Sequence, residues 1–459
     1  MYRETTIAST ATPPGEGGIG IVRISGKDAL SVGNHIFRMK NGKQFGEVPP
    51  FSMHYGHVAD GDTLIDEGLG VFMKGPHSYT GEDVVEIQIH GSMAALRRTL
   101  RLAWHFGAVP AQRGEFTERA FLNGRLDLAQ AEAVMDIIRA RGDAALVQAE
   151  THLSGALSSF VHGVRDKLKD LITRLEVTID FPEEDLEDMT LQEISVRLEP
   201  IGADLQRLIK RSETGRFIRD GMRTVIAGRP NVGKSSLLNA LLQEDRAIVT
   251  DIPGTTRDTI EETISVGSVP LVLMDTAGLR RTEDQAEKIG VEKTRHFLEQ
   301  ADLILAVING AEPLEEEDRK LLAQLKGRRA VVIVNKSDLP AAVTEQDIRS
   351  IAGSVPLVEL SARSGRGMDS LEQELRHMAE GQDAEAGREL YLMNERHMDL
   401  VRKASASVER AEKSCMAGMP ADCITVDLSE AWNDLGSITG ETMDEELIHS
   451  IFSQFCVGK

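Results

Sequence analysis

The chain has 459 residues, a length that suggests about three domains of ordinary size. Its 52 Lys and Arg against 73 Asp and Glu give a net charge of −21, which excludes broad non-specific attraction to nucleic acid or anionic membranes, so any RNA contact requires a local basic patch. The three cysteines are too few for a disulfide framework, and neither a signal peptide nor a membrane-length apolar run is present, so we expect a cytoplasmic protein with no membrane contact.

Short strands and glycines characterise residues 1–118. Residues 18–25 and 83–90 alternate apolar and polar side chains, which predicts two half-buried strands. In the second of them Glu86 and Gln88 share one face, opposite the apolar side chains. That polar face is available to a ligand, although a half-solvated sheet is the simpler explanation for one strand alone.

Residues 119–218 have a helical pattern, because apolar side chains recur at steps of three and four. Gly155 and Gly163 each cost about 1 kcal/mol relative to alanine inside a helix, so close packing or a bend is expected near them. The acidic run 183–188 predicts a solvated turn between helices. The apolar stripes are Leu128, Ala131, Met135 and Ile138, then Leu153, Leu157, Phe160, Val164, Leu168, Leu171 and Leu175.

Residues 219–379 alternate short apolar runs with helical segments, which predicts a parallel sheet with helices on both faces. Near their start, residues 228–235 spell G-x-x-x-x-G-K-S between a predicted strand and a predicted helix, as in a phosphate-binding loop. Such a loop closes backbone N–H groups around phosphates. We expect Lys234 to neutralise the β- and γ-phosphates and Ser235 to bind Mg²⁺.

Four further motifs indicate a guanine nucleotide. Residues 275–278 (DTAG) follow a strand and place Asp275 near Mg²⁺ and the Gly278 amide near the γ-phosphate. Asp338, in the N-K-S-D motif, can accept both N–H donors of guanine, which favours GTP. The other two motifs are residues 361–363, which offer a backbone amide to the guanine carbonyl, and residues 254–258, which can order around the γ-phosphate and Mg²⁺. The predicted nucleotide contacts are Asn231, Val232, Gly233, Lys234, Ser235, Ser236, Thr250, Thr255, Asp275, Gly278, Asn335, Lys336, Asp338, Ser361, Ala362 and Arg363, with Ser235 and Thr256 on Mg²⁺.

One expected catalytic residue is missing from these motifs. Many GTPases place a glutamine after the D-x-x-G turn to orient water, whereas this chain has Leu279, which forms no hydrogen bond through its side chain. The sequence also identifies no arginine finger, a device worth about 10³–10⁵ in rate. Hydrolysis therefore requires another group to orient water and another source of positive charge.

The helical pattern returns after Gly381, through residues 389–413 and 425–435. Helical segments before and after the nucleotide-binding part are expected to pack together, with that part inserted between them. A last helix is expected to begin at Thr442, with Glu445 completing a capping box. Its predicted apolar side is Leu447, Ile448, Ile451, Phe452 and Phe455.

Over essentially its full length the chain resembles the bacterial tRNA modification GTPase family MnmE, also called TrmE, of the TrmE-Era-EngA-YihA-Septin-like superfamily. The nucleotide motifs alone indicate only a translation-factor-related GTPase. Four further segments narrow the resemblance: residues 11–15 (ATPPG), 78–83 (SYTGED), 114–121 (GEFTERAF) and 456–459 (CVGK).

The resemblance implies a multidomain α/β protein. An α+β tetrahydrofolate-binding and dimerisation domain would span residues 1–118. An all-α domain would span residues 119–218 and 380–459, with a Ras-like α/β G domain inserted at residues 219–379. The family is a homodimer that works with an FAD-dependent partner, MnmG or GidA, in a heterotetrameric or larger complex. The implied activity is GTP hydrolysis that drives aminomethyl or carboxymethylaminomethyl modification at C5 of the wobble uridine of certain tRNAs.

The resemblance also supplies the missing catalytic parts. By position, Asn231 matches a K⁺ ligand, and backbone carbonyls of Thr250, Ile252 and Thr255 complete that site. K⁺ beside the phosphates would replace the positive charge of an arginine finger when two G domains meet. Glu287 matches the glutamate that orients water, in the role that Leu279 cannot perform. The implied catalytic residues are Glu287, Lys234 and Gly278.

Four residues match the family's 5-formyltetrahydrofolate positions: Arg23, Glu86, Arg125 and Lys459. Arg125 stands where relatives have lysine, which keeps the charge and changes the contact geometry. Cys456 lies next to that site in the resemblance and is a candidate for the modification chemistry. Its alternatives are a core cysteine at a helix end and a lipidation box, the latter disfavoured by the glycine and lysine that follow.

Two other functions stay open at this stage. A ribosome-assembly or RNA-regulatory GTPase of the same superfamily would normally carry an RNA-binding module or a second G domain, and the sequence reveals neither. A folate-dependent one-carbon transfer enzyme is suggested by the N-terminal part. The choice between glycine and ammonium as the second donor is also open.

Overall fold

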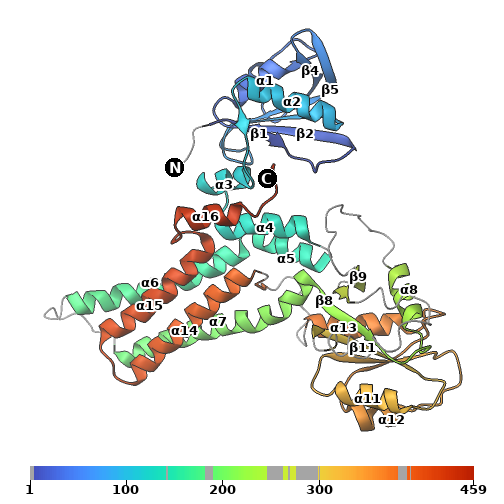
Figure 1. The fold of residues 1–459 in the computed structure, drawn as a ribbon. Coiled ribbons are helices and arrows are strands. Elements are labelled where there is room, and N and C mark those ends of the chain that lie inside the picture. Colours follow the sequence, from blue (N-terminus) through green and yellow to red (C-terminus); the bar gives the residue numbers. More distant parts are fainter. Residues whose placement is uncertain are drawn as a thin grey trace. The chain divides into compact units, whose positions relative to one another are not determined.

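The structure is a computed structural model of the chain (Figure 1). Its contacts divide the chain into two compact units. The first comprises Met1–Met135, His152–Leu198 and Ala406–Lys459, and the second Asp136–Thr151 and Glu199–Ser405. The domain boundaries expected near residues 118, 218 and 379 are not the borders of these units, and they stay predictions. The described residues are 5–140, 143–180, 190–244, 262–266, 269–274, 298, 300–380, 390–392 and 394–459.

The first unit contains a seven-stranded sheet of order β3-β4-β5-β6-β2-β1-β7. All its neighbouring strands are antiparallel except β1 and β7, which are parallel. The alternating patterns at residues 18–25 and 83–90 are confirmed as the adjacent strands β2 and β6. The strands are β1 Ile7–Thr10, β2 Gly17–Ser25, β3 Phe37–Met39, β4 Met53–Asp60, β5 Thr63–Met73, β6 Val84–Gly91 and β7 Val109–Pro110.

Helices α1 (Ala29–Ile36) and α2 (Met93–His105) lie on one face of this sheet, and a short 3-10 turn spans Phe45–Glu47. Their apolar sides meet the inward side chains of the strands in a single core. The apolar side chains that alternate along the strands and those spaced by three and four along the helices are therefore buried in the same layer. This shared core explains why this part folds as α+β. The core includes Val22, Ile24, Ile36, Val85, Ile87, Leu96, Leu102 and Ala103.

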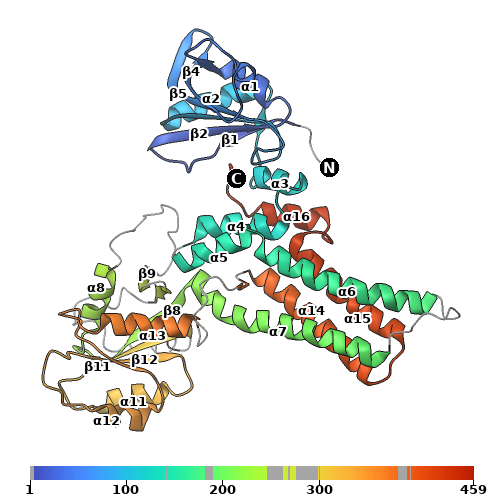
Figure 2. The same cartoon turned by 180° about the vertical axis from the view of Figure 1, so that it is seen from behind.

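The remaining helices of the first unit pack in pairs. α6 (Ala156–Asp180) and α15 (Ala421–Thr439) run side by side in both views (Figures 1 and 2). α3 (Glu115–Leu122) contacts α16 (Glu445–Phe452). A second core joins the start of α4 (Leu128–Arg139) to the C-terminal segment through Leu128, Ala131, Met135, Ile448, Phe452 and Phe455. Helical segments from both ends of the chain therefore pack together, as expected.

Three details of the helical predictions are wrong. The stripe that begins at Leu153 is not one helix, because α5 (Asp143–Leu153) ends there and the chain turns at Gly155 before α6 begins. The last helix begins at Glu445, capped by the Asp444 side chain, which accepts the Leu447 N–H. Thr442 is not the cap: it precedes Asp444, and its hydroxyl donates to the Asn433 carbonyl. Leu447 is exposed, since the buried stripe runs through residues 448, 452 and 455.

The second unit contains a six-stranded sheet of order β13-β12-β11-β8-β10-β9. Only β9 and β10 pair antiparallel, so the predicted parallel sheet is confirmed. Its strands are β8 Met222–Ala227, β9 Glu262–Val266, β10 Val269–Leu273, β11 Leu303–Asn309, β12 Ala330–Asn335 and β13 Leu357–Glu359.

Separate cores on the two faces of this sheet confirm that helices cover both sides. α8 (Lys234–Glu244) and α13 (Met368–Glu380) pack into one core, and α11 (Glu316–Gln324) and α12 (Glu345–Ala352) into the other. In such a sheet, ligands bind at the carboxyl ends of the strands. Besides α4 and α5, two further helices contribute residues to both units: α7 (Leu191–Asp220) and α14 (Glu395–Met416). Across the described residues, none of the helices is long and apolar enough to cross a membrane.

Candidate functional site

The phosphate-binding loop lies where sequence spacing placed it, between the end of β8 and the start of α8. Gly233 has φ +102°, and a Cβ there would come within 2.1 Å of the Asn335 Nδ2 atom. No side chain fits at that position, so the loop closes tightly enough for its N–H groups to surround an anion at the start of α8.

Lys234 is the first residue of α8. Its Nζ donates to the carbonyl oxygens of Gly228 at 2.8 Å and Arg229 at 2.7 Å. Burial lowers the pKa of the Lys234 ammonium below its ordinary value of 10.5. Phosphate oxygens would be better acceptors than neutral carbonyls, so a triphosphate would draw this ammonium toward itself and stabilise its charged form.

Asn231 is exposed and has φ +60°, the left-handed region that asparagine tolerates better than most residues. Ser235 and Ser236 are also exposed at the start of α8. Ser235 therefore offers a described hydroxyl for Mg²⁺, and Asn231 offers an amide oxygen for K⁺. The other residues predicted for these ions, the γ-phosphate and water lie outside the described residues: Thr250, Ile252, Thr255, Thr256, Asp275, Gly278 and Glu287, as does Leu279.

Asn335 connects the phosphate-binding loop to the predicted base-binding segment. It ends β12 and is only 3% exposed. Its Nδ2 donates to the Val232 carbonyl at 2.8 Å, and its Oδ1 accepts the Ala362 N–H at 3.0 Å. One buried side chain therefore holds the phosphate-binding loop at a set separation from the predicted base-binding segment.

The Asp338 carboxylate is exposed beside this link. The Ser361 hydroxyl, the Asp338 backbone N–H, Arg363 and Lys336 together hold the pKa of Asp338 below its ordinary value. The group is therefore an acceptor at neutral pH, as recognition of the two guanine N–H donors requires. The structure brings all the predicted residues of the 335–338 and 361–363 motifs to this end of the sheet.

Arg229, inside the phosphate-binding loop, was not predicted to have a role. Its Nε lies 2.8 Å from Asp318 Oδ2, and it also forms ion pairs with Glu315 and, at 3.7 Å, Glu312. Asp318 is only 1% exposed and caps the start of α11 by accepting the Glu315 N–H. The loop is thereby anchored to α11, and no local sequence signal could have revealed a partner so distant in the chain.

A second cluster lies in the first unit, on the face of β2 and β6. Arg23 and Glu86 are opposite each other in the strand register, with Nε and Oε1 2.6 Å apart. Arg23 also donates to the Gly458 carbonyl at 3.4 Å. Burial and the nearby Arg23 charge lower the pKa of the Lys459 ammonium, while Glu86 and Cys456 act in the opposite direction. Residues from both ends of the chain therefore meet here.

The C-terminal tetrapeptide is an integral part of this cluster. Val457 bridges to Arg113, and the Gly114 N–H donates to the Cys456 carbonyl at 3.3 Å. Gly458 has φ +92°, and a Cβ there would lie 2.0 Å from the Thr10 carbonyl oxygen. The Cys456 thiol is free and exposed, which excludes the alternative of a core cysteine.

Tyr79 joins the two arginines of the predicted folate site. Its ring lies 5.3 Å from the Arg23 guanidinium and 5.0 Å from that of Arg125. Arg125 also donates to the Tyr79 carbonyl at 2.7 Å, and the Tyr79 hydroxyl lies 2.9 Å from Thr117 Oγ1. Arg23, Glu86 and Arg125 are thus linked, directly or through a tyrosine that the sequence marked only as part of the S-Y-T-G-E-D motif, and Lys459 lies within the electrostatic influence of Arg23 and Glu86.

A buried ionic network holds that motif in place. Arg119, only 4% exposed, pairs with Glu115 at 2.8 Å and with Glu82 at 3.1 Å. Ser25 in turn donates to Glu82 at 2.7 Å. A buried charge is tolerated only when its hydrogen bonds are satisfied, so residues 78–83 have little freedom to shift relative to α3.

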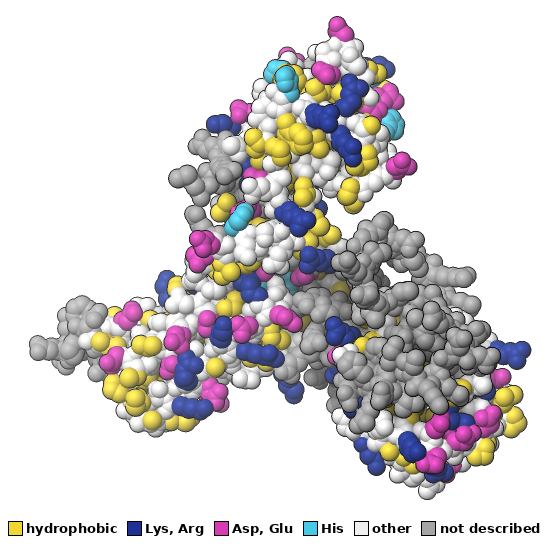
Figure 3. Space-filling model, in the orientation of Figure 1, with side chains coloured by type: hydrophobic (Ala, Val, Ile, Leu, Met, Phe, Trp, Pro, Cys, Tyr) yellow, Lys and Arg dark blue, Asp and Glu magenta, His cyan; other side chains and the backbone are white. Residues whose placement is uncertain are grey.

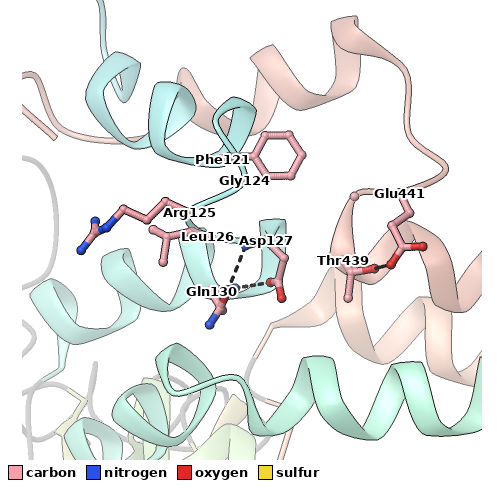
Figure 4. Close-up of a pocket in the computed structure, with 9 residues that line it drawn as sticks. Phe121, Gly124, Arg125, Leu126, Asp127, Gln130, Thr439 and Glu441 are labelled. Atoms are coloured by element: carbon pink, nitrogen blue, oxygen red, sulfur yellow. Dashed lines mark hydrogen bonds between the residues drawn. The ribbon is translucent and has the colours of Figure 1, made fainter. Parts of the chain in front are cut away.

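A nearby hollow of about 410 Å³ lies between the start of α4 and the end of α15 (Figure 4). The Arg125 side chain points away from the side of the hollow formed by Thr439 and Glu441. Asp127 and Gln130 hydrogen-bond each other, and Glu441 pairs with Arg165. These polar groups are therefore partnered within the protein.

The residues present fit the ligands expected of each site to different degrees. Two arginines, a lysine and a carboxylate around an aromatic ring suit a folate, which combines a carboxylate tail with flat rings and N–H donors. No cluster of three or more His, Cys, Asp or Glu in the described part of the chain is arranged to hold a metal ion. For Mg²⁺ the described chain provides the Ser235 hydroxyl alone.

Two family models together match most of the chain. A family model described as the GTP-binding protein TrmE N-terminus matches residues 6–125, and one described as the MnmE helical domain matches residues 128–456. A protein of Symbiobacterium thermophilum described as tRNA modification GTPase MnmE is 48% identical over 458 residues, covering 99% of this chain and 100% of its own. The protein of that description from Geobacillus thermodenitrificans is 46% identical over 462 residues, covering 100% of both chains.

Among solved structures, the G domain of the T. maritima FeoB iron transporter is 23% identical and covers 34% of this chain and 98% of its own. Its TM-score is 0.26, so the relatives above, not this likeness, carry the assignment.

Proposed function

The chain belongs to the tRNA modification GTPase MnmE family, and from this we propose that its GTP hydrolysis drives a complex that modifies the wobble uridine of certain tRNAs at C5. The observation that most supports this proposal is the coexistence of two built sites in one chain. One is the guanine-nucleotide site at the carboxyl ends of β8 and β12. The other is the Arg23 cluster, which the C-terminal tetrapeptide completes.

At the nucleotide site the chain binds and orients GTP and stabilises the negative charge of its phosphates. The loop N–H groups and Lys234 hold the phosphates, and Asp338 selects guanine. Asn335 keeps these two regions at a constant separation. Mg²⁺ and K⁺, when bound, supply positive charge to the transferring phosphoryl group. Ser235 and Thr256 would hold the first ion, and Asn231 with the carbonyls of Thr250, Ile252 and Thr255 the second.

We assign the water-orienting role to Glu287, since Leu279 has no polar side chain. Its carboxylate would accept a hydrogen bond from the attacking water and align it with the γ-phosphate. The K⁺ site would be completed when two G domains meet in a homodimer. Closing and reopening of that pair would convert hydrolysis into movement elsewhere in the complex.

We assign the Arg23 cluster to a tetrahydrofolate such as 5-formyltetrahydrofolate. Arg23, Arg125 and Lys459 would pair with the ligand's carboxylates and carbonyl groups, and Glu86 would accept ring N–H groups. Tyr79 keeps both guanidinium groups in place through its ring and carbonyl. Folate would carry the one-carbon unit, with glycine or ammonium as the second donor and Cys456 beside it.

The complete reaction would require an FAD-dependent partner of the MnmG type and tRNA as substrate, in the cytoplasm. The experiment that tests this is nucleoside analysis of tRNA from cells lacking the protein. Loss of the wobble-uridine modification, restored by the intact chain, supports the proposal. A normally modified tRNA pool together with a defect in ribosome assembly would favour a ribosome-assembly GTPase instead.

A truncation separates the two sites. Removing residues 456–459 takes away Cys456 and Lys459 and leaves the nucleotide site intact, so GTP hydrolysis should persist while tRNA modification is lost. Cys456→Ser is the matched single change, because it retains the seated backbone of the tetrapeptide. Normal modification in cells carrying the truncated chain would refute the role given to this segment.

A further inference from the structure

One segment of this acidic chain contains no acidic residue. Residues 91–114 include Arg97, Arg98, Arg101 and Arg113 and neither aspartate nor glutamate, although the chain has 73 acidic residues. Most of the segment forms α2 and the turn that follows it. A locally basic surface is therefore built into a protein whose net charge of −21 repels polyanions elsewhere.

The arginines lie on the outer face of α2. Leu96, Thr99, Leu102 and Ala103 are buried against the sheet, whereas Arg97, Arg98 and Arg101 are exposed. Arg97 and Arg101 are one helical turn apart, a rise of about 6 Å along the axis. No ion pair joins any of the three arginines to a carboxylate of the described residues, so their charges face solvent. In Figure 3, Lys and Arg side chains gather over the region where Figure 1 draws α2.

Two aromatic rings continue this face at the C-terminal end of the helix, Trp104 in its last turn and Phe106 directly after it. Trp104 is 37% exposed and Phe106 is 39% exposed. The His35 ring of α1 stacks on Phe106 with centroids 4.7 Å apart. The indole N–H of Trp104 is held by the Ala8 carbonyl at 3.4 Å, which limits rotation of the ring. Positioned rings next to free guanidinium groups offer flat surfaces for stacking beside positive charge.

We propose that this arginine–aromatic face, formed by Arg97, Arg98, Arg101, Trp104 and Phe106, binds tRNA at an unpaired segment. Arginines contact phosphate oxygens, and exposed rings stack on bases that are not paired. The inference rests on the proposed function, in which tRNA is the substrate. It adds the surface on which the substrate is held, apart from the nucleotide site and the Arg23 cluster.

A membrane surface is a less suitable partner for the same charges. An interfacial helix inserts its apolar side into the lipid boundary. In α2 that side is already occupied, because Leu96, Leu102 and Ala103 belong to the core beneath the sheet. The exposed rings are confined to the end of the helix, where they suit a few bases better than a bilayer.

The test measures binding of the full-length protein to unmodified tRNA by fluorescence anisotropy between 50 and 200 mM KCl. The variant Arg97→Ala/Arg98→Ala/Arg101→Ala removes three phosphate contacts and favours the helix, since alanine has the highest helix propensity. The slope of log affinity against log salt should therefore fall by about two to three. Phe106→Leu, which keeps an apolar side chain without a ring, should weaken binding about tenfold.

The matched control removes equal charge elsewhere through Arg319→Ala/Lys320→Ala/Lys326→Ala, three exposed residues on or just after α11. Its affinity and salt slope should equal those of the unaltered protein. Circular dichroism of each variant checks that it is folded, and if the triple variant is unfolded, the single changes at Arg97, Arg98 and Arg101 should each lower the slope by about 0.7–0.9.

An unchanged salt slope in the α2 variant would overturn the inference. The inference would also be overturned if the α2 variant bound tRNA normally but no longer bound phosphatidylglycerol vesicles, a result that would indicate a membrane surface. Nucleoside analysis of tRNA from cells lacking the protein distinguishes a failure of the α2 inference from a failure of the proposed function. If the wobble modification disappears in those cells while the α2 variant binds tRNA normally, the α2 inference fails and the proposed function stands.

Discussion

Arg229 is the residue that most directly links the phosphate-binding loop to its support. Replacing it by alanine leaves the Asp318 carboxylate, which is 1% exposed, without its cation. We expect the free energy of unfolding of the nucleotide-binding part to fall by about 3 kcal/mol. GTP affinity should fall about tenfold, because the loop loses its anchor. Chemical denaturation and fluorescent GTP-analogue titration measure the two effects.

The double variant Arg229→Met/Asp318→Asn is the control for this prediction. It removes both charges and retains similar volumes, so most of the lost stability should return. If Arg229→Ala is as stable and binds GTP as tightly as the unaltered chain, the ion pair does not support the loop.

Lys234 gives the nucleotide site a dependence on pH. Burial lowers the pKa of its ammonium in the free site below 10.5, and bound triphosphate favours the charged form. As pH rises from 7 toward 10, the free site loses this proton first, so GTP affinity should fall and binding should take up protons. Affinity measured across this range, and calorimetry in buffers of different ionisation enthalpy, test the sign.

Lys234→Arg is the comparison for that titration, because a guanidinium stays protonated throughout the range. Its affinity, whatever its value at pH 7, should fall less with pH than that of the unaltered protein, because only the guanine N–H that Asp338 accepts is lost in this range. An affinity of the unaltered protein that stays constant to pH 10 would contradict the prediction.

At the scale of elements, a charged clamp joins α6 to α15. Arg165 of α6, with a side chain 5% exposed, lies 4.0 Å from the centre of the Trp432 ring and pairs with Glu441. Burial alone would raise the pKa of Glu441, but hydrogen bonds from Arg165 and His162 lower it below 4.5. A carboxyl group whose pKa is lower in the folded than in the unfolded chain stabilises the folded chain at neutral pH. This stabilisation is lost as the pH falls through the folded-state pKa.

Glu441→Gln should therefore lower the free energy of unfolding by about 1–2 kcal/mol at pH 7, a modest value because Glu441 is 47% exposed. The difference should shrink below pH 4.5, the ordinary pKa of the group. Trp432 fluorescence during urea unfolding reports on this pair when Trp104 is replaced by phenylalanine. Equal free energies of unfolding for Glu441→Gln and the unaltered protein at pH 7 would show that the pair of Arg165 and Glu441 does not stabilise the fold.

At the scale of the whole molecule, the two sites lie in different parts of the chain, and a cation-dependent cycle is proposed to couple them. Replacing Na⁺ by K⁺ should accelerate GTP hydrolysis about tenfold or more, because K⁺ would supply transition-state charge in place of an arginine finger. Steady-state phosphate release in each salt at equal ionic strength measures this. Asn231→Ala should remove the difference between the salts, and equal rates in the unaltered protein would refute the potassium assignment.

The sequence by itself determined the features that depend on neighbouring residues. The phosphate-binding loop, the N-K-S-D segment and the alternating strands β2 and β6 follow from spacing, because periods of 2 and 3.6 and turn chemistry are local properties. They were enough to predict a parallel sheet with helices on both faces. They also predicted helical segments from both sides of the nucleotide-binding part that pack together.

Only the tertiary structure decided which distant residues meet. Arg229 with Asp318, Tyr79 between Arg23 and Arg125, and the seat of the C-terminal tetrapeptide join segments that no local pattern relates. The start of α16 is another example, since the capping side chain is that of Asp444, which accepts the Leu447 N–H, and not that of Thr442. Where a sequence offers two residues that could cap a helix, the packing of the folded chain selects between them.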